Sequence, residues 1–293
     1  MRFQRLLAFL LLINLSCQKE TRTDDISVPV GFEETPLAKP MMPGILDEAS
    51  GIADSKSNPG YLWVQQDSGN PNDISLLSYD GTFLKKVNIK TGVNRDWEDM
   101  VTANGPVAGN NYISLADIGD NGLAFPEYYI YRFAEPGATV DSVFDCDKIT
   151  FKYADGAHDA EAIMVDNATK DIYIITKQDT PSAIYKLSYP QSTTTVNTAV
   201  LSGTLTFNGV TSAAFSPDGK EVLIKTYNAI HYWEKKKGET LEQTLMEKPV
   251  NISYKFEPQG EAICFKNDNS GFFTLSERPS VIAAVNLNFY KRK

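Results

Sequence analysis

Polar and apolar positions along the chain follow a pattern that returns about every 50 residues. Each unit opens with a short segment in which an oxygen-bearing side chain stands among small or apolar residues. A turn comes next, and then an apolar run rich in β-branched and aromatic residues, which predicts a buried strand. The five opening segments are Ala49–Ile52, Trp97–Met100, Ala160–Ile163, Thr211–Ala214 and Gly260–Ile263.

Two further strands are predicted in each unit, joined by polar corners. The second strands are expected at Tyr61–Val64, Tyr112–Leu115, Ile172–Ile175, Val222–Ile224 and Phe272–Leu275. The third strands are expected at Ile74–Ser78, Tyr128–Phe133, Ala183–Leu187, Ala229–Trp233 and Val281–Leu287. Three such strands, repeated along a chain, are typical of a β-propeller blade. The sequence therefore predicts an all-β fold, a five-bladed β-propeller.

The blade count depends on the longest unit, which lies between Glu98 and Glu161. Asp141–Tyr153 in this unit is interpreted as a fourth strand of the second blade, and a sixth blade at this place is the alternative. The last blade has only three predicted strands of its own. A strand from around Ile26–Phe32 is expected to complete it, which would leave no exposed sheet edge there.

Length and composition allow a large core, with 293 residues of which 42% are hydrophobic. The formal net charge of −9 disfavours nucleic acid and anionic membrane surfaces as partners. No apolar stretch reaches the roughly 20 residues that a membrane-spanning helix needs. We expect a monomer.

The first residues predict an export signal, because Met1–Ser16 carries two arginines followed by a short apolar run. Cys17 resembles the lipid-attachment cysteine of bacterial lipoproteins, and Gln18–Glu20 resembles the charged tag of surface-displayed Bacteroidetes-type lipoproteins. An outer-membrane lipoprotein, displayed on the cell surface and held only by its lipid anchor, is therefore expected, with ordinary secretion as the alternative. The expected parts are a signal peptide with its lipid-attachment cysteine (1–17), a flexible tether (18–30) and one propeller domain (31–293).

Several well-known motifs are missing from the sequence, namely the P-loop, G-x-G-x-x-G, G-x-S-x-G and H-E-x-x-H. The two histidines, His158 and His231, are too few for a histidine-rich zinc site. Cys264 is expected to be a small buried hydrophobic residue, and a disulfide with Cys146 is the alternative.

The oxygen-bearing position of the repeat predicts a metal site. The innermost strand of each propeller blade lines the axial channel, so these side chains should face one another at one end of it. Three converging carboxylates repel one another and need a cation, and an all-oxygen site suits Ca²⁺ better than Mg²⁺. The alternative is that the glutamates only hydrogen-bond the neighbouring backbone. The five predicted ligands are Ser50, Glu98, Glu161, Ser212 and Glu261.

A second set of polar residues follows the second strands, at the same end of the channel. Its three basic residues would form a cradle for a phosphate or carboxylate ligand. Its acidic residues would bind a further cation or orient water, and His158 is the candidate general base. Ordinary turns and solvated surface are the alternative for each residue. The predicted ligand-binding residues are Asp67, Asp117, Asp120, Lys177, Lys225, Glu277 and Arg278.

These segments resemble a known family. Glu48–Gly51, Gln259–Ile263 and Phe272–Glu277 are similar to segments of five-bladed propellers of the SdiA-regulated type. The five-residue column also resembles the calcium ring of soluble calcium-activated nucleotidases (apyrases) and, more loosely, phytase-like propellers. The resemblance spans about residues 45–290 and implies a propeller and calcium, but the SdiA-regulated group implies no reaction.

Two functions follow as hypotheses. The first is a calcium-binding propeller of the cell envelope whose channel mouth binds a small anionic ligand or a surface partner. The second is a calcium-dependent hydrolase of phosphoanhydrides or phosphate esters, which would use metal-activated water. The binding module is favoured, because the rim loops lack the arginine-rich nucleotide-binding segments of apyrases and no clear acid–base pair is present.

Overall fold

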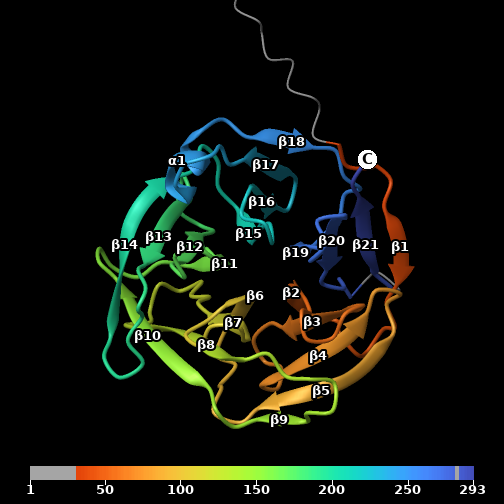
Figure 1. Cartoon of the computed structure of the whole chain (residues 1–293), viewed down its shortest axis with the longest axis horizontal. Helices are drawn as coiled ribbons and strands as arrows, with labels where there is room; N and C mark the ends of the chain where they lie inside the picture. The colour runs from red at the N-terminus through yellow and green to blue at the C-terminus, as the bar shows by residue number, and fades with distance from the viewer. Residues whose placement is uncertain (1–30, 281–283) are drawn as a thin grey trace, which may run out of the picture. The chain divides into compact units, whose positions relative to one another are not determined.

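Strands dominate the computed structural model, which describes residues 31–280 and 284–293 (Figure 1). The predicted all-β fold is confirmed: in the described residues, the only helix among the regular elements is α1 (Leu241–Met246), at the outer edge beside β14. The predicted signal peptide, Cys17 and the tether lie outside the described residues.

Four hydrogen-bonded sheets contain all the strands named in the described residues. The first has the order β2 (Ala49–Asp54), β3 (Tyr61–Gln66), β4 (Asp73–Ser78), β5 (Phe83–Ile89), β9 (Ser142–Val143). One four-stranded sheet has the order β15 (Val210–Phe215), β16 (Glu221–Thr226), β17 (Ile230–Glu234), β18 (Val250–Ile252), and the other has β19 (Gly260–Phe265), β20 (Gly271–Ser276), β21 (Asn286–Lys291), β1 (Leu37–Pro40).

The fourth sheet is made of two antiparallel halves. One half has the order β6 (Trp97–Asn104), β7 (Asn111–Asp117), β8 (Tyr128–Ala134), β10 (Asp147–Tyr153), and the other β11 (Ala160–Val165), β12 (Ile172–Thr176), β13 (Ala183–Leu187), β14 (Asn197–Thr204). The outer strands β10 and β14 join the halves through a short parallel pairing. Residues 147–153 therefore add a fourth strand to β6–β8, as expected, whereas β9 pairs with β5 instead.

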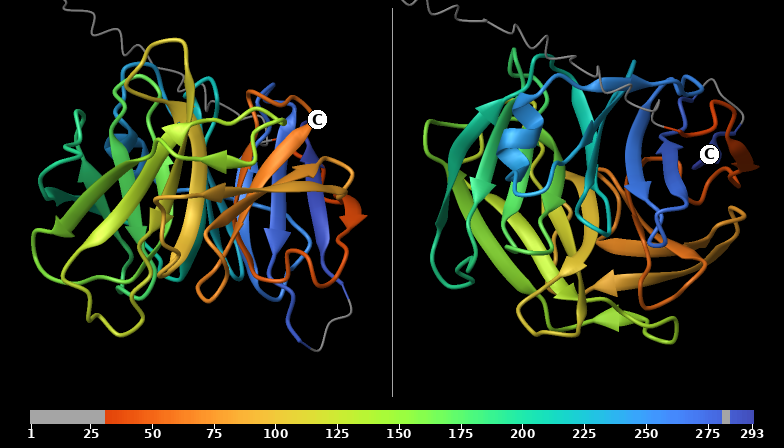
Figure 2. Two further views of the ribbon diagram at one scale, coloured as in Figure 1. Left: turned by 90° about the horizontal axis from the view of Figure 1, so that it is seen from below. Right: turned by 45° about the horizontal axis from the view of Figure 1, so that its top comes forward.

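Five strands, β2, β6, β11, β15 and β19, lie innermost and surround a common centre (Figure 1). Each of them contacts the next, and β19 contacts β2, so the circle closes. Figure 2 shows the same sheets from the side, with their strands running between two faces of the unit formed by residues 31–293. The starts of the five inner strands therefore share one face, which we call the mouth.

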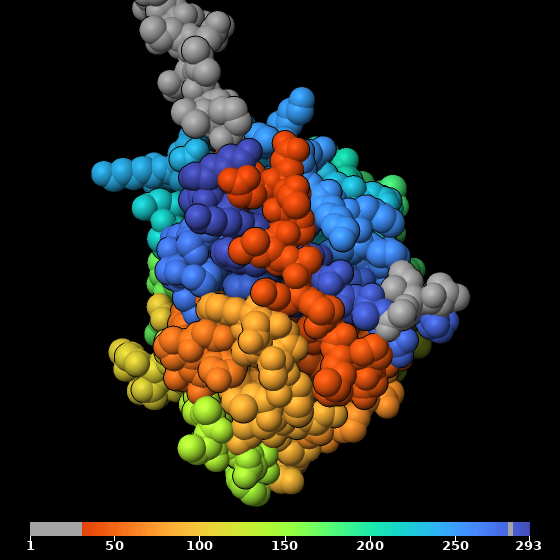
Figure 3. Space-filling model, turned by 90° about the vertical axis from the view of Figure 1, so that its right-hand side faces the viewer, coloured from red at the N-terminus to blue at the C-terminus, as the bar shows by residue number. Residues whose placement is uncertain are grey.

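The last sheet is completed by a strand from near the start of the described chain. Leu37 of β1 pairs with Phe289 of β21, and residues 31–40 lie across the C-terminal strands (Figure 3). The strand lies later in the chain than the expected Ile26–Phe32. Residues 26–30 of that expectation lie outside the described residues, and Phe32 forms an isolated bridge with Arg292. Proline is tolerated at the outer strand of a sheet, where its missing N–H has no partner to lose, so Pro40 can end β1.

Neighbouring sheets pack face to face through apolar side chains. Trp63 of β3 and Trp97 of β6 are fully buried in one such layer. The indole Nε1 of Trp97 donates to the carbonyl of Val93 at 2.9 Å, so the burial leaves no unpaired donor. Burying a large apolar side chain contributes about 1.5–3 kcal/mol. These layers hold the inner strands, and with them the mouth, in place.

Candidate functional site

Every inner strand begins with a β-bulge. In each pairing with the next strand, the register skips one residue close to the start of the inner strand. A bulged residue is left out of the ladder and its strand bends, which frees the side chain to take another direction. The five skipped residues are Ser50, Glu98, Glu161, Thr211 and Glu261.

The fourth member of this set differs from the prediction. Ser212 pairs with Lys225 in the ladder, so Thr211 occupies the position equivalent to the other four residues. The Thr211 hydroxyl donates to the Gly260 carbonyl at 3.1 Å, just as the Ser50 hydroxyl donates to a carbonyl of its neighbouring inner strand. The prediction of Ser212 was off by one residue, because the sequence does not show where the bulge falls.

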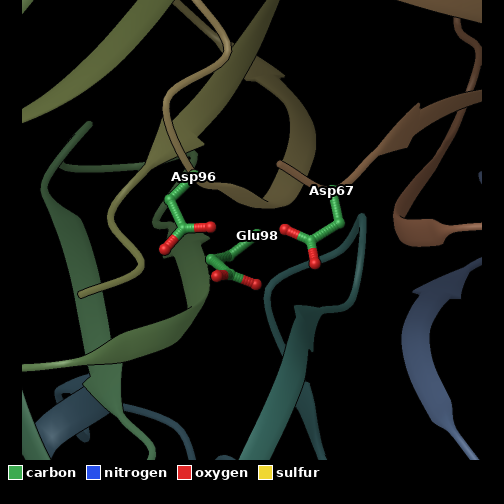
Figure 4. A group of neighbouring side chains, drawn as sticks. All are labelled: Asp67, Asp96 and Glu98. Carbon is green, nitrogen blue, oxygen red and sulfur yellow. The ribbon is translucent and has the colours of Figure 1, made fainter. Parts of the chain in front are cut away.

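Three carboxylates converge at one side of the mouth. Asp67 follows β3, Asp96 precedes β6, and Glu98 is the bulged residue of β6. One oxygen from each lies within 4.8 Å of the others, and the side chains point toward one another (Figure 4). Glu98 is buried and the two aspartates are half-buried. We call these three residues the triad; Glu98 and Asp67 were predicted as site residues, and Asp96 was not.

Little positive charge offsets the triad: burial raises the pKa of Asp96 more than the charge of Arg95 lowers it. Burial raises the pKa of Glu98 well above its usual range, and the charges of Glu161, Asp67 and Asp96 raise it further. Burial also raises the pKa of Asp67 to about 6, although the Ser68 amide, 2.5 Å from its Oδ1, acts in the opposite direction. Burial is the main reason that the pKa of Asp96 is raised as well. Binding of a cation would therefore relieve the repulsion among the three carboxylates of the triad.

The end of β7 and the loop after it position the triad. The Asp117 Oδ1 atom accepts a hydrogen bond from the Asp96 amide at 2.8 Å. Gly119 lies so close that a Cβ atom on it would be 2.1 Å from Oε1 of Glu98. Asp120 accepts the amides of Ala124 and Phe125 at 2.8 and 2.9 Å, which shapes the turn. Asp117 and Asp120, predicted as ligand-binding residues, thus make backbone hydrogen bonds next to the triad.

A second acidic group occupies the other side of the mouth, and it has an internal cation. The ammonium of Lys177 contacts Oε1 of Glu161 and donates to the Tyr227 hydroxyl at 3.1 Å. That hydroxyl donates in turn to Oε1 of Glu261 at 2.6 Å. Burial raises the pKa of Glu277 to about 9, and the charge of Glu261 adds to this effect. Glu161, Glu261 and Glu277 form what we call the paired group.

The other two predicted basic residues also have carboxylate partners. Lys225 is fully buried, with its Nζ 3.3 Å from Oε2 of Glu257. Arg278 donates from Nε to Oδ1 of Asp47 at 2.7 Å and forms a second contact with the same carboxylate. Each of the three predicted cradle residues is therefore engaged by an acidic side chain. An anion at the mouth would compete with these carboxylates.

The candidate general base, His158, has both ring nitrogens engaged. Nδ1 is 2.8 Å from Oδ2 of Asp179, and Nε2 is 2.8 Å from the Tyr185 hydroxyl and 3.2 Å from Oδ1 of Asp155. The ring also packs edge-on against Tyr153, with 4.9 Å between the ring centroids. A base needs a nitrogen within reach of the proton that it removes. The arrangement fits a structural role of His158.

Asp99 is a buried residue that the sequence analysis missed. Its Oδ2 accepts the amides of Ile163 in β11 at 3.1 Å and of Ala213 in β15 at 3.5 Å, and its Oδ1 accepts the Ser212 hydroxyl at 3.2 Å. One carboxylate thus links three inner strands just behind the mouth. The only sequence signal was an acidic residue directly after Glu98, in a strand expected to be apolar.

The two described cysteines are free, Cys146 half-buried and Cys264 buried. The alternative of a disulfide between them is therefore not realised. The helix α1, in the described part of the chain, is too short to cross a membrane.

The triad fits a hard divalent cation. Carboxylate oxygens are the ligands that calcium prefers, and its flexible six- to eightfold coordination tolerates residues from separate loops. Two nearby aspartates support the fit, since Oδ2 of Asp117 and Oδ2 of Asp159 are buried without a hydrogen-bond partner. Asp159 also raises the pKa of Asp96 through its charge. Surplus buried carboxylate oxygens of this kind are costly unless a cation or water satisfies them.

No protein-family model and no curated protein matches the chain. Among solved structures, a chain from the crystal structure of a nidogen/laminin complex is similar, with a TM-score of 0.45 and 10% sequence identity. The similarity covers 78% of this chain and 72% of that chain. At this level it identifies neither a family nor a function.

Proposed function

We propose that residues 31–293 form a five-bladed β-propeller that binds a calcium ion at the mouth of its axial channel. Five inner strands support this blade count, because each begins a run of four neighbouring strands. The runs are β2–β5, β6 to β8 with β10, β11–β14, β15–β18, and β19 to β21 with β1. The pairing of β10 with β14 then joins two blades at their outer edges.

The convergence of Asp67, Asp96 and Glu98 is the observation that carries the metal proposal. The two lysines of the mouth do not neutralise this triad, because Lys177 pairs with Glu161 and Lys225 pairs with Glu257. Three carboxylates on one side with raised pKa values form a site that a divalent cation stabilises strongly. Calcium fits better than magnesium, since magnesium requires near-ideal octahedral geometry.

The ligand proposed for the mouth is a small anion that coordinates the calcium ion directly. Without the ion, the mouth carries an excess of carboxylates, and its basic residues are already paired. An anion is therefore expected to bind only to the calcium-loaded protein. We further propose that the chain is an exported outer-membrane lipoprotein anchored through Cys17, as the N-terminal sequence suggests.

Calorimetric titration of the purified chain with calcium tests the proposal. We expect saturable binding by the wild type and at least a tenfold loss of affinity in Glu98→Gln, which keeps the shape of the side chain and deletes its charge. Glu242→Gln is the matched control, because it deletes a carboxylate charge that pairs with Lys186 far from the mouth. Absence of binding by the wild type, or equal affinity in Glu98→Gln, would refute the calcium site.

The hydrolase alternative has its own readout. Phosphate release from nucleotides and phosphate esters is measured with calcium and with chelator. We expect none above background, because both ring nitrogens of His158, the candidate base, are engaged. Calcium-dependent phosphate release that is abolished in Glu98→Gln would refute the binding module and support the hydrolase.

A further inference from the structure

The mouth contains two acidic groups that are neutralised in different ways. Next to the triad, the paired group contacts the side chain of Lys177 through Glu161. Neighbouring carboxylates repel one another unless a positive charge offsets them. The triad has no lysine of this kind, whereas the paired group carries its cation on the chain itself.

The ammonium of Lys177 lies between oxygen atoms of neighbouring side chains. It contacts Oε1 of Glu161 and the Tyr227 hydroxyl, and Tyr227 connects it to Glu261. The Lys177 side chain is 21% exposed and that of Glu161 is 6% exposed, so solvent screens this ion pair only partly. The Nζ atom also lies 5.2 Å from the centroid of the Tyr227 ring, which adds a favourable cation–π contact.

An ammonium group differs from a metal ion in ways that matter at this position. It carries one charge, offers three donors, and is tied to the backbone of the loop after β12, so it cannot dissociate. A divalent ion entering the paired group would have to displace it from Glu161. The triad therefore remains the part of the mouth where an ion can enter without breaking an existing ion pair.

We propose that Lys177 is a built-in cation that fills the second cation position of the mouth and limits the protein to one divalent ion. This inference rests on the proposed calcium site at the triad. Loss of the ammonium leaves Glu161 without its positive partner. The carboxylates of Glu161 and Glu261, with the Tyr227 hydroxyl between them, then offer oxygen ligands for a second calcium ion. Lys177 thus determines how many ions bind.

The test is the number of calcium ions bound per chain, measured by calorimetry and by native mass spectrometry. We expect one ion in the wild type and two in Lys177→Met, which keeps much of the length of the side chain but removes its charge. Lys177→Arg retains the charge and is expected to bind one ion. Lys186→Met is the matched control, since Lys186 is similarly exposed and pairs with Glu242 far from the mouth.

The outcomes separate this inference from the calcium site itself. No ion in the wild type overturns the proposed calcium site, whereas one ion in both the wild type and Lys177→Met overturns only the role of Lys177. Glu161→Gln added to Lys177→Met is expected to return the count to one. If Lys177→Met does not fold, Lys177→Gln retains a donor to Glu161 and removes the same charge, and a count of one in that variant rejects the proposal.

Discussion

Gly119 lies directly against the carboxylate of Glu98. A Cβ atom at this glycine would be 2.1 Å from Oε1 of Glu98 and 2.5 Å from Oδ2 of Asp96, far inside van der Waals contact. Both atoms belong to side-chain ends, so the clash can be relieved by moving the two carboxylates rather than the backbone. A side chain at residue 119 is therefore expected to disturb the proposed metal site more than the fold.

Gly119→Ala is expected to lower calcium affinity at least tenfold, because it pushes Glu98 and Asp96 out of the triad. Calorimetric titration measures the affinity, and thermal unfolding without calcium measures the fold. Gly122→Ala, in the same loop, is the control, since the nearest atom to its added Cβ would be 4.0 Å away. Unchanged affinity in a folded Gly119→Ala variant would show that the position of Glu98 is not critical for binding.

Removal of calcium is expected to lower the melting temperature. An ion that binds only the folded chain stabilises it by about 2.7 kcal/mol at a hundredfold excess over its Kd, which corresponds to roughly 5 °C for a domain of this size. Thermal unfolding with calcium and with chelator measures the difference. In Glu98→Gln we expect a clearly smaller difference between the two curves; a wild type indifferent to the chelator contradicts the prediction.

The stability of the calcium-free protein should fall as the pH rises from 5 to 9. Burial, as the largest cause, raises the pKa of Asp67 to about 6 and that of Glu277 to about 9, above values near 4 in an unfolded chain. The folded state then holds more protons than the unfolded state, so this stability is present at low pH and is lost as each folded pKa is passed.

Melting curves across this pH range, with and without saturating calcium, test whether stability falls as the pH rises. Calcium replaces the protons on the triad, so we expect a smaller fall in its presence and a calcium affinity that rises with pH. A melting temperature of the calcium-free protein that climbs steadily from pH 5 to 9 would be the opposite result. Glu277→Gln is expected to weaken the part of the dependence near pH 9.

Asp99→Ala is expected to destabilise the fold by roughly 3–5 kcal/mol, because the buried amides of Ile163 and Ala213 lose their acceptor. Asp99→Asn retains an oxygen for these amides and should cost less. Denaturant unfolding measures both variants. We expect calcium to stabilise Asp99→Asn as much as the wild type, since Asp99 lies behind the mouth. Equal stability of Asp99→Ala and the wild type would show that Asp99 does not stabilise the fold.

The sequence predicted the inner strands well because each begins with the same local pattern. Four of the five predicted segments begin at the first residue of β2, β6, β11 and β19, and Thr211–Ala214 begins one residue after the start of β15. The sequence does not show the register of strand pairing. The position of a bulge depends on the partner strand, so the pattern pointed to Ser212 although Thr211 is the skipped residue. The third strand of the last unit was likewise expected from Val281. Residues 281–283 lie outside the described residues, and β21 begins at Asn286.

Charge pairing was the other limit of the sequence. The sequence predicts a cradle for an anionic ligand from Lys177, Lys225 and Arg278. Arg278 instead forms an ion pair with Asp47, which lies 231 residues earlier in the chain. Such long-range partners leave no local signal. Asp96 and Asp99 flank the predicted Glu98 and were passed over, because only burial distinguishes them from ordinary polar residues.

The pairing of β1 with β21 has a consequence for how the protein is made. Synthesis releases the chain from its first residue onward, so β1 emerges long before the partner that holds it. Until β21 follows, the apolar layer that joins Leu62 to Phe273 stays open to water, and the circle of sheets is incomplete. A product that stops short of Asn286 is expected to bind hydrophobic dyes and to be digested quickly by proteases. The pairing of β21 with β1 is therefore a late step in the completion of the circle of sheets.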